Sequence, residues 1–349
     1  MITTTAPTGV GESAAGTLGK GAIASMKCLL PLLAALVIAV VPSAAPAAPV
    51  PLHFTTFAAT DLPLGDVVWT GSAFLYNAET LGKLETSDAS GDNFKPFLSF
   101  DQGGEEMRCV PAPNAPSYWP AGIYCHTPDN RILRLATDGS SMTELAKLPS
   151  GDKSDGAIAF DTVGKFGYAL LAATGGSTST GGEVFSIRKS GTVKAVGSYS
   201  GPGGAENIVI APARFGTASG AVLLSVDQDL GVGRLLAMDA RGNVKVLADR
   251  LPYGINPIEV LRASPANRAA GLPAAGLYLA DTNSKTVYFT AAPGLKSYVG
   301  DVIVVTEKPR DDSARVWIVQ PKGSGFQIVG LTTDLPTQSW NFESAAYMP

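Results

Sequence analysis

Six polar side chains open apolar, strand-like segments at a regular spacing, and this spacing could bring their oxygen atoms together. The segments are "GDVVWTG" (65–71), "EEMRCVP" (105–111), "SDGAIAFD" (154–161), "GAENIVIAP" (204–212), "INPIEVLRA" (255–263) and "NFESAAYMP" (341–349). Their polar openers are Asp66, Glu106, Asp155, Glu206, Asn256 and Glu343. Successive residues among the first five are 40 to 51 positions apart, a period typical of propeller blades. Openers at equivalent positions of such repeats would meet around one axis.

A ring of this kind favours a bound cation. Several carboxylates held close together raise each other's pKa unless a cation or hydrogen-bond donors lie between them. Ligand sets made only of oxygen suit calcium, which accepts six to eight oxygens at about 2.3–2.6 Å. We therefore predict a Ca²⁺ site in this ring, with another divalent cation as the alternative. The simpler interpretation is that these residues only cap turns or bind water in the channel.

The elements that must position this ring are short strands joined by tight turns. Runs such as "GEVFSIRKSGTVKAVGSY" and "GRLLAMDARGNVKVLADRL" predict hairpins that pair 184–187 with 193–196 and 235–238 with 244–247. Helical periodicity is nearly absent. The sequence thus predicts an all-β, six-bladed β-propeller whose ring is closed by an N-terminal strand at 52–59. Seven blades are the alternative, if residues near Asp301 begin a blade of their own.

The composition excludes some classes of partner. The net charge is -4, and charged residues make up only 16% of the 349-residue chain. This composition provides no broad basic surface for a phosphate backbone, so we expect no nucleic-acid partner.

The N-terminal segment is typical of an export signal. Lys20 and Lys27 precede an apolar run at 29–41, and "PSAAPAAPVP" follows with the small residues of a cleavage site. This run would rise about 20 Å as a helix, short of the ~30 Å hydrocarbon core. We predict an N-terminal extension and signal peptide at 1–47, one propeller domain at 48–349, and a secreted protein, extracellular or periplasmic, without stable membrane insertion after cleavage. A retained membrane anchor and a start at Met26 are open alternatives.

Cysteine usage agrees with export. Cys28 lies in the predicted signal, so the mature chain keeps Cys109 and Cys125 in two neighbouring strand-like runs. We predict a disulfide between them in an oxidising compartment. Two buried free thiols are the alternative.

Several of these motifs resemble a known family. "LGDVVW", "AENIVIAP", "GINPIEV" and "GLYLADTNSKTVYF" are similar to segments of the senescence-marker-protein and gluconolactonase-like six-bladed propellers, within the calcium-dependent phosphotriesterase superfamily, and more loosely to NHL-repeat propellers. The resemblance implies metal ligands at Asp66 and at Asn207, or at Glu206 if the register shifts by one. With Asn256 and Glu343, these residues complete the predicted metal site.

The same resemblance implies a metal-dependent lactonase or esterase, but one residue departs from the family pattern. The family has an aspartate that is both ligand and general base where this chain has Asn256, and an amide cannot accept the proton. We therefore predict Glu206 as the first candidate for the base, Asp155 as the second, and Glu259 as a further alternative. The mature chain has two histidines, which excludes a multi-histidine metal site. It also has no G-x-S-x-G motif, the pattern typical of serine hydrolases.

Two classes of function follow from these observations. The first is hydrolysis of a lactone or ester in a calcium-supported pocket at the channel mouth. The second is a non-catalytic binding or structural module for a glycan, peptide or cell-wall ligand. In either case we expect a monomer with a small-molecule or carbohydrate ligand.

Overall fold

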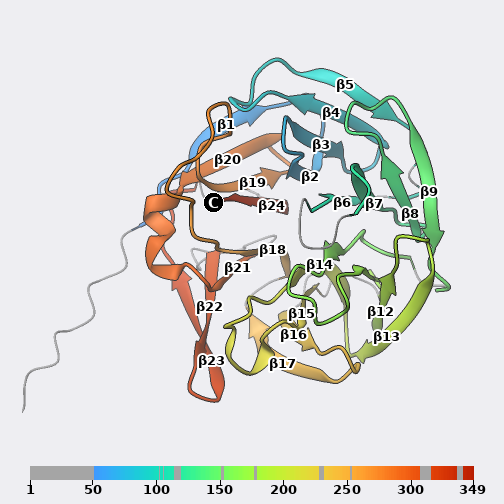
Figure 1. Cartoon of the computed structure of the whole chain (residues 1–349). Helices are drawn as coiled ribbons and strands as arrows, with labels where there is room; N and C mark the ends of the chain where they lie inside the picture. Colours follow the sequence, from blue (N-terminus) through green and yellow to red (C-terminus); the bar gives the residue numbers. More distant parts are fainter. Residues whose placement is uncertain are drawn as a thin grey trace, which may run out of the picture. The chain divides into compact units, whose positions relative to one another are not determined.

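The strands form six antiparallel sheets arranged around a central axis (Figure 1). The computed structural model describes residues 51–101, 103–104, 106–113, 119–150, 153–176, 179–227, 232–251, 254–306, 316–335 and 341–349. Within these residues each sheet has four strands, and all the sheets belong to the unit Ala48–Pro349. The predicted six-bladed propeller is therefore confirmed, whereas the predicted signal peptide lies outside the described residues.

The first three blades follow the chain in order, each from its innermost strand outward. Blade one contains β2 (Leu64–Trp69), β3 (Phe74–Ala78), β4 (Lys83–Ser87) and β5 (Lys95–Ser99). Blade two contains β6 (Arg108–Pro111), β7 (Ile123–His126), β8 (Arg131–Leu135) and β9 (Met142–Lys147). Blade three contains β10 (Ile158–Phe160), β11 (Leu170–Ala173), β12 (Gly181–Ile187) and β13 (Val193–Ser200).

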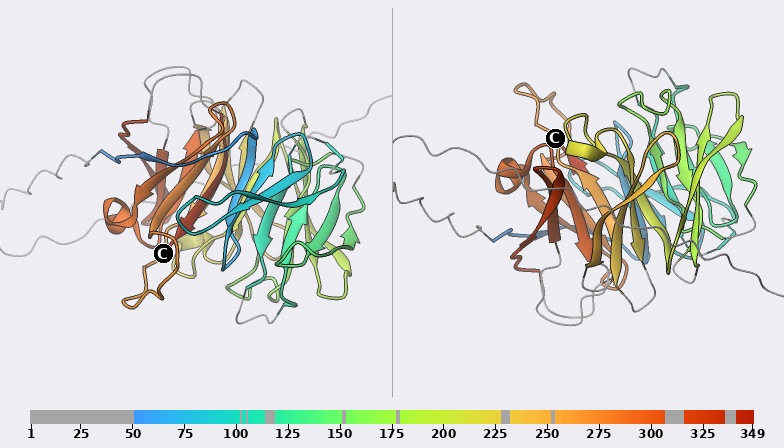
Figure 2. Two further views of the ribbon diagram at one scale, coloured as in Figure 1. Left: turned by 90° about the horizontal axis from the view of Figure 1, so that it is seen from above. Right: turned by 90° about the horizontal axis from the view of Figure 1, so that it is seen from below.

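The other three blades complete the ring, and Figure 2 shows their strands running between the two faces of the propeller. Blade four contains β14 (Gly204–Ile210), β15 (Val222–Asp227), β16 (Gly233–Met238) and β17 (Val244–Leu251). Blade five contains β18 (Ile255–Val260), β21 (Val302–Thr306), β22 (Val316–Lys322) and β23 (Gly325–Leu331). Blade six contains β24 (Phe342–Met348), β19 (Gly276–Asp281), β20 (Thr286–Ala291) and β1 (Thr55–Ala59).

The described helices are two 3-10 segments, η1 (Gly216–Ala218) and η2 (Ala292–Tyr298). Low helix content agrees with the sequence pattern. Neither segment is long or apolar enough to span a bilayer.

The hairpins predicted from turn residues are present. Ile187 pairs with Val193 across the β12–β13 turn, and Met238 pairs with Val244 across the β16–β17 turn. Both turns contain a glycine with positive φ, Gly191 at 81° and Gly242 at 85°. Because only glycine adopts this region without a steric penalty, these two positions fix the register of the outer hairpins.

The ring closes with strands from both ends of the domain. In blade six, β24 from the C-terminal end is innermost and β1 from the N-terminal end is outermost. The predicted closure by the segment at 52–59 is therefore confirmed. Closure pairs strands that would otherwise expose unpaired edges.

The order of strands in the last two blades departs from the simple repeat. After β18 the chain leaves blade five, forms β19 and β20 in blade six, and then returns to blade five through β21. The "GLYLADTNSKTVYF" segment consequently belongs to the sixth blade and not to the blade opened by Ile255. This exchange explains why the C-terminal part of the sequence can be divided into blades in more than one way.

The core lies between neighbouring blades, because successive residues of a strand point to opposite faces of its sheet. In β19, Leu277 and Leu279 pack on one side in a cluster that includes Ile303 of blade five. Tyr278 and Ala280 pack on the other side in a cluster that includes Phe74 of blade one. A sheet covered on both faces needs apolar residues at nearly every position, as the fully buried β19 shows.

Blade two contains the predicted disulfide. Cys109 of β6 and Cys125 of β7 are directly opposite in the ladder and are bonded to each other. The prediction of a disulfide is confirmed, and the free-thiol alternative is wrong.

Removing this bond is expected to destabilise the domain. A crosslink that closes a loop of 16 residues restricts the unfolded chain and contributes about 3 kcal/mol. A Cys109→Ser/Cys125→Ser double variant should therefore unfold at a clearly lower urea concentration than the oxidised parent chain. Equal midpoints would show that the bond does not constrain the unfolded state.

Candidate functional site

The innermost strands of the blades line the channel (Figure 1), and several of them carry bulges at the predicted polar positions. The β14–β15 ladder skips Glu206, between the pairs of Ala205 and Asn207. The β19–β24 ladder skips Glu343 in the same way, and the β18–β21 ladder is irregular between Ile255 and Ile258, around Asn256. A bulge adds an unpaired residue and redirects its side chain. The bulges thus explain how polar residues leave the apolar alternation at strand starts.

The centre of the channel contains a buried cation, Arg108, at the start of β6. Its Nη2 donates to Oε2 of Glu106 at 2.6 Å, to Oδ1 of Asn256 at 3.1 Å, and to Oε2 of Glu343 at 3.4 Å. Nη1 donates to the carbonyl oxygen of Gly65 in blade one. One guanidinium therefore joins inner strands of blades one, two, five and six.

The electrostatics around this guanidinium favour its charged form. Burial alone would lower the pKa of Arg108, but the carboxylates of Glu106, Glu343, Asp66 and Glu206 outweigh burial and raise that pKa. Glu343 also accepts hydrogen bonds from Asn256 at 2.6 Å and from Asn341. We call this set, Arg108 with Glu106, Asn256 and Glu343, the hub.

Asp66 lies against the hub with both carboxylate oxygens bonded. Its Oδ1 accepts from the Val67 amide at 2.9 Å and from the Ser344 hydroxyl at 2.6 Å, and its Oδ2 accepts from the Cys109 amide at 2.7 Å. Burial raises the pKa of Asp66, and Arg108 and these donors counteract the rise. The carboxyl group thus ties together inner strands of blades one, two and six.

The structure brings together some of the predicted site residues and separates others. Asn256 and Glu343 contact Arg108, while Asp66 and Glu206 act on Arg108 through their charges. Asn207 instead lines a pocket farther along the channel. The carboxylate of Asp155 packs against the backbone of Gly176.

The predicted ligand set does not fit one metal ion in this arrangement. Oxygens of Asn256 and Glu343 converge on the guanidinium of Arg108, which therefore occupies the position a shared metal would need. Asn207 Oδ1 accepts a hydrogen bond from the Ile208 amide at 2.8 Å. The sequence interpretation missed Arg108, although a cation two residues after the opener Glu106 was visible in "EEMRCVP".

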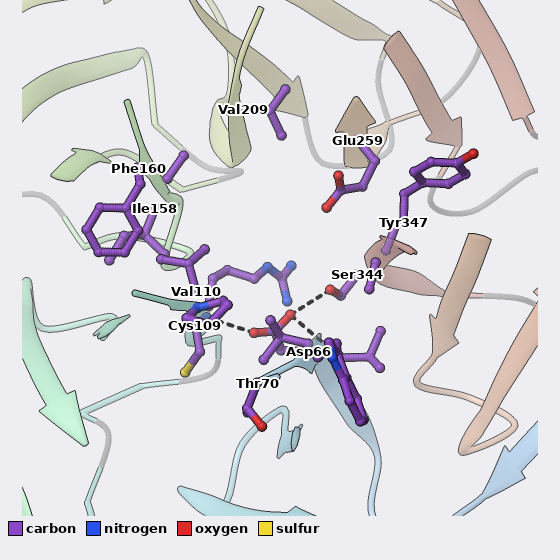
Figure 3. A pocket seen from close by; sticks show the side chains of 18 of the residues that line it. Asp66, Thr70, Cys109, Val110, Ile158, Phe160, Val209, Glu259, Ser344 and Tyr347 are labelled. Atoms are coloured by element: carbon purple, nitrogen blue, oxygen red, sulfur yellow. Dashed lines mark hydrogen bonds between the residues drawn. The ribbon is translucent and has the colours of Figure 1, made fainter. Parts of the chain in front are cut away.

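A second feature is a pocket of about 780 Å³, which we call the funnel (Figure 3). It lies beyond the hub, toward the C-terminal ends of the inner strands. Its floor contains Asp66 and Arg108. Its walls combine polar groups with apolar side chains, which include Trp69, Val110, Ile158, Phe160, Val209 and Tyr347. This volume is typical of sites for small organic ligands.

Glu259 of β18 is the acidic residue on the wall of the funnel. Figure 3 shows its side chain pointing into the same space as Asp66 and Ser344. Its Oε2 accepts a hydrogen bond from the Val260 amide at 3.2 Å. Burial raises the pKa of Glu259 to about 7, since the nearby Arg262 only partly offsets burial and Asp66 adds to the rise. A carboxyl group that exchanges a proton near neutral pH suits general acid–base chemistry.

Asn207 supplies a donor to the same space. Its Oδ1 is used by Ile208, and within the described part of the chain its Nδ2 makes no hydrogen bond. The funnel therefore presents a proton-exchanging carboxyl, an amide donor and, at Arg262, a cation. Glu206 and Asp155 are not among the described residues that line it.

Comparisons with known proteins concern the fold. Neither a protein-family model nor a curated protein matches the sequence. Among solved structures, a chain of a nidogen/laminin complex has 9% identity and a TM-score of 0.49, covering 81% of this chain and 83% of its own. A presumed gluconolactonase has 12% identity and a TM-score of 0.45, covering 80% and 94%. The calcium-binding protein regucalcin from Agrobacterium tumefaciens has 14% identity and a TM-score of 0.48, covering 81% of each chain.

Proposed function

We propose that this protein is an exported hydrolase that binds a small ester or lactone in the funnel and cleaves it with water activated by Glu259. The observation that carries the proposal is the Glu259 carboxyl group, with a pKa of about 7, in a pocket of about 780 Å³ lined by both apolar and polar side chains. Apolar walls would hold the organic part of the substrate, and the few polar groups would orient the reacting bond.

The residues of the funnel have distinct roles in this proposal. The Glu259 carboxylate accepts a proton from the water whose oxygen attacks the carbonyl carbon. Asn207 Nδ2 donates to the oxygen that gains negative charge. When the carbon–oxygen bond breaks, Glu259 returns the proton to the leaving alcohol oxygen, so the carboxylate is regenerated.

This mechanism replaces the predicted bases and includes no calcium step. Glu206 and Asp155 remain predictions for the base. The Glu206 carboxylate lies near Arg108, and the Asp155 carboxylate lies beside Gly176. The predicted calcium ligands converge on Arg108 or lie apart from it. We therefore assign the proton transfer to Glu259, which the sequence offered as the alternative.

The proposal predicts a dependence of activity on pH. Because the base must be ionised and the pKa of Glu259 is about 7, kcat/KM should fall about tenfold per pH unit below 7 and level off above it. A panel of aryl esters and lactones assayed from pH 5 to 9 checks this, with circular dichroism confirming that the fold persists. A flat profile would contradict the role of Glu259.

A binding module is the second candidate, and the aromatic residues of the funnel favour it. Trp69, Phe160 and Tyr347 line one pocket, and aromatic faces stack on sugar rings and other flat ligands. Saturable binding of a glycan or apolar ligand, without turnover of any ester or lactone, would favour this candidate.

Export is also part of the proposal. The disulfide between Cys109 and Cys125 suits an oxidising compartment, and the sequence pattern at 1–47 suits a cleaved signal peptide. We expect a monomeric mature protein in the periplasm or outside the cell. N-terminal sequencing and light scattering of the secreted form test both statements.

A further inference from the structure

A groove of about 1220 Å³ lies on blade three, separate from the funnel. Its lining comes from the β10–β11 loop and the β12–β13 hairpin of that blade, and from the β16–β17 turn of blade four. Trp119 from blade two also lines it. The groove and the funnel share no described lining residue. The groove is therefore a second concave surface, and it extends over parts of three blades.

The charged side chains that line the groove are all cations. They are Lys165, Arg188, Lys189, Lys194 and Arg241. All five are exposed, and no Asp or Glu is among the described lining residues. Asp239 lies outside the lining but accepts a hydrogen bond from the Arg241 backbone amide at 2.8 Å. Five cations with one carboxylate beside them give the groove a net positive charge.

Several of these cations are not neutralised within the described part of the chain. Lys165, Arg188 and Lys194 belong to none of the ion pairs found there, and their side chains donate no hydrogen bond to a described residue. Like charges gathered on one surface create a field that attracts anions. Because the cations come from separate segments, a ligand with several negative charges along its length would contact more of them than a single ion could.

The β10–β11 loop is held in place by a buried carboxylate. Asp161 is 1% exposed, and its Oδ1 accepts from the amides of Val163 and Gly164 at 3.0 and 2.8 Å. Its Oδ2 accepts from the amides of Phe166 and Tyr168 at 2.7 and 3.0 Å. These four bonds set the shape of the loop before any ligand binds, which lowers the cost of ordering it on binding.

The same loop exposes an aromatic ring in the groove. Tyr168 is 40% exposed and has a φ of 59°, a backbone conformation that is uncommon for an aromatic residue. Its carbonyl oxygen accepts a hydrogen bond from the Trp119 indole at 3.0 Å. An aromatic face held in this way can pack on the flat face of a sugar ring. Among ligands with several negative charges, the ring therefore favours a carbohydrate.

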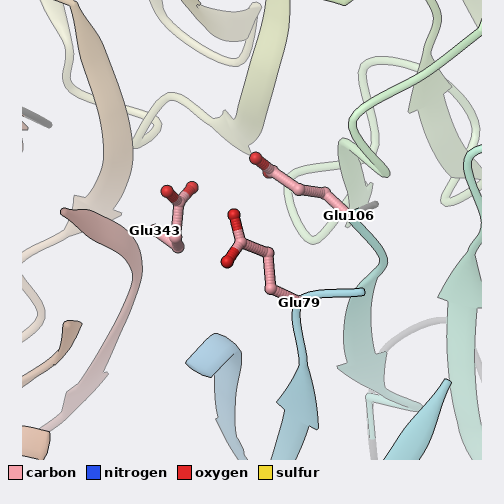
Figure 4. Close-up of side chains that lie close together, drawn as sticks. All are labelled: Glu79, Glu106 and Glu343. Carbon is pink, nitrogen blue, oxygen red and sulfur yellow. The ribbon is translucent and has the colours of Figure 1, made fainter. Parts of the chain in front are cut away.

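Acidic side chains gather instead at the hub. Figure 4 shows the carboxylates of Glu79, Glu106 and Glu343 pointing toward one another, and one oxygen of each lies within 4.8 Å of the others. The net charge of -4 is thus an average over an acidic centre and a basic groove. A polyanion would be attracted to the groove and repelled by the carboxylates at the axis.

We propose that the groove binds an acidic polysaccharide, whose anionic groups contact Arg188 and Lys194 and one of whose sugar rings packs on Tyr168. Carboxylate and sulfate groups both have the required charge. A membrane surface fits less well, because Tyr168 is the only lining residue among the described exposed large apolar side chains, and insertion at a membrane interface needs a larger apolar face. The proposal goes beyond the function proposed for the funnel and does not depend on it.

Calorimetric titration of the protein with polygalacturonate, a carboxylated polysaccharide, tests the proposal. Binding should be saturable, and its affinity should fall about tenfold between 50 and 200 mM NaCl, as expected when two or three counterions are released from a charged polymer. A parallel titration with heparin tests sulfate groups, and binding of either polymer supports the proposal. Dextran, a neutral polysaccharide, should not bind.

Variants of the groove locate the binding. Arg188→Gln/Lys194→Gln removes two charges from the groove and should weaken binding by at least about tenfold. Lys83→Gln/Lys95→Gln makes the same change in net charge at exposed positions of β4 and β5 in blade one, outside the groove, and should bind like the parent chain. Tyr168→Asn removes the ring and keeps a residue that tolerates positive φ, so it should weaken binding about fivefold.

Three results would overturn the proposal. The first is the absence of binding to both acidic polysaccharides. The second is equal weakening in the two double variants, because binding would then follow net charge and not the groove. The third is binding of polyglutamate or double-stranded DNA as tightly as polygalacturonate, since the groove would then not recognise a carbohydrate. The double variants decide the proposal even if Tyr168→Asn does not fold, and hydrolysis is not a readout, so the outcome leaves the role of Glu259 untouched.

Discussion

Replacing Glu259 by glutamine is expected to reduce kcat/KM for the best ester or lactone by about 100- to 10,000-fold. Glutamine keeps the size and the hydrogen-bonding atoms of the side chain but cannot accept a proton at neutral pH. Because Glu259 lies on the wall of the funnel and accepts a hydrogen bond from the Val260 amide, a bond that glutamine can also accept, the substitution removes little that holds the fold together. Steady-state kinetics at pH 8 measure the loss.

The controls separate catalysis from structure. Glu85→Gln changes a glutamate on β4 that does not line the funnel, so its activity should match the parent chain. In Glu259→Gln the pH dependence below 7 should also disappear, which a purely structural role would not cause. Retention of full hydrolysis in Glu259→Gln would exclude Glu259 as the base and return attention to Glu206 and Asp155.

The propeller could be predicted because the spacing of the polar openers and the positions of the turn residues indicate the same fold. Polar openers such as Asp66 and Glu206 recur at blade spacing, and turn glycines such as Gly191 and Gly242 mark the outer hairpins. Near-continuous apolar strands such as β19 then follow from blades covered on both sides. Strand exchange between blades five and six was not predictable from this repeat, because β19 matches the strand pattern of either blade.

The site was only partly predictable, for a physical reason. The openers indicate which side chains approach the axis, but the bulges at Glu206 and Glu343 decide how far each one turns inward. A bulge depends on the partner strand and leaves no local signal in the sequence. Arg108 was therefore overlooked, since it follows an opener and is not one itself.

Replacing Arg108 by methionine is expected to destabilise the domain by about 3–5 kcal/mol. The change leaves Glu106 and Glu343 without their guanidinium and leaves the carbonyl of Gly65 without its donor. Arg108→Lys restores the charge but not the planar fork that reaches several acceptors at once, so it should recover only part of the loss. Urea unfolding monitored by circular dichroism measures all three proteins.

Arg134→Met is the matched control for this result. Arg134 is half-buried on β8 and donates to the carbonyl of Ala121 at 2.8 Å, and we expect its replacement to cost less than about 1 kcal/mol. The comparison isolates the position of the charge, because both variants lose one guanidinium and gain one thioether. If Arg108→Met were as stable as Arg134→Met, the carboxylates of the hub would have to be neutral or paired with another cation.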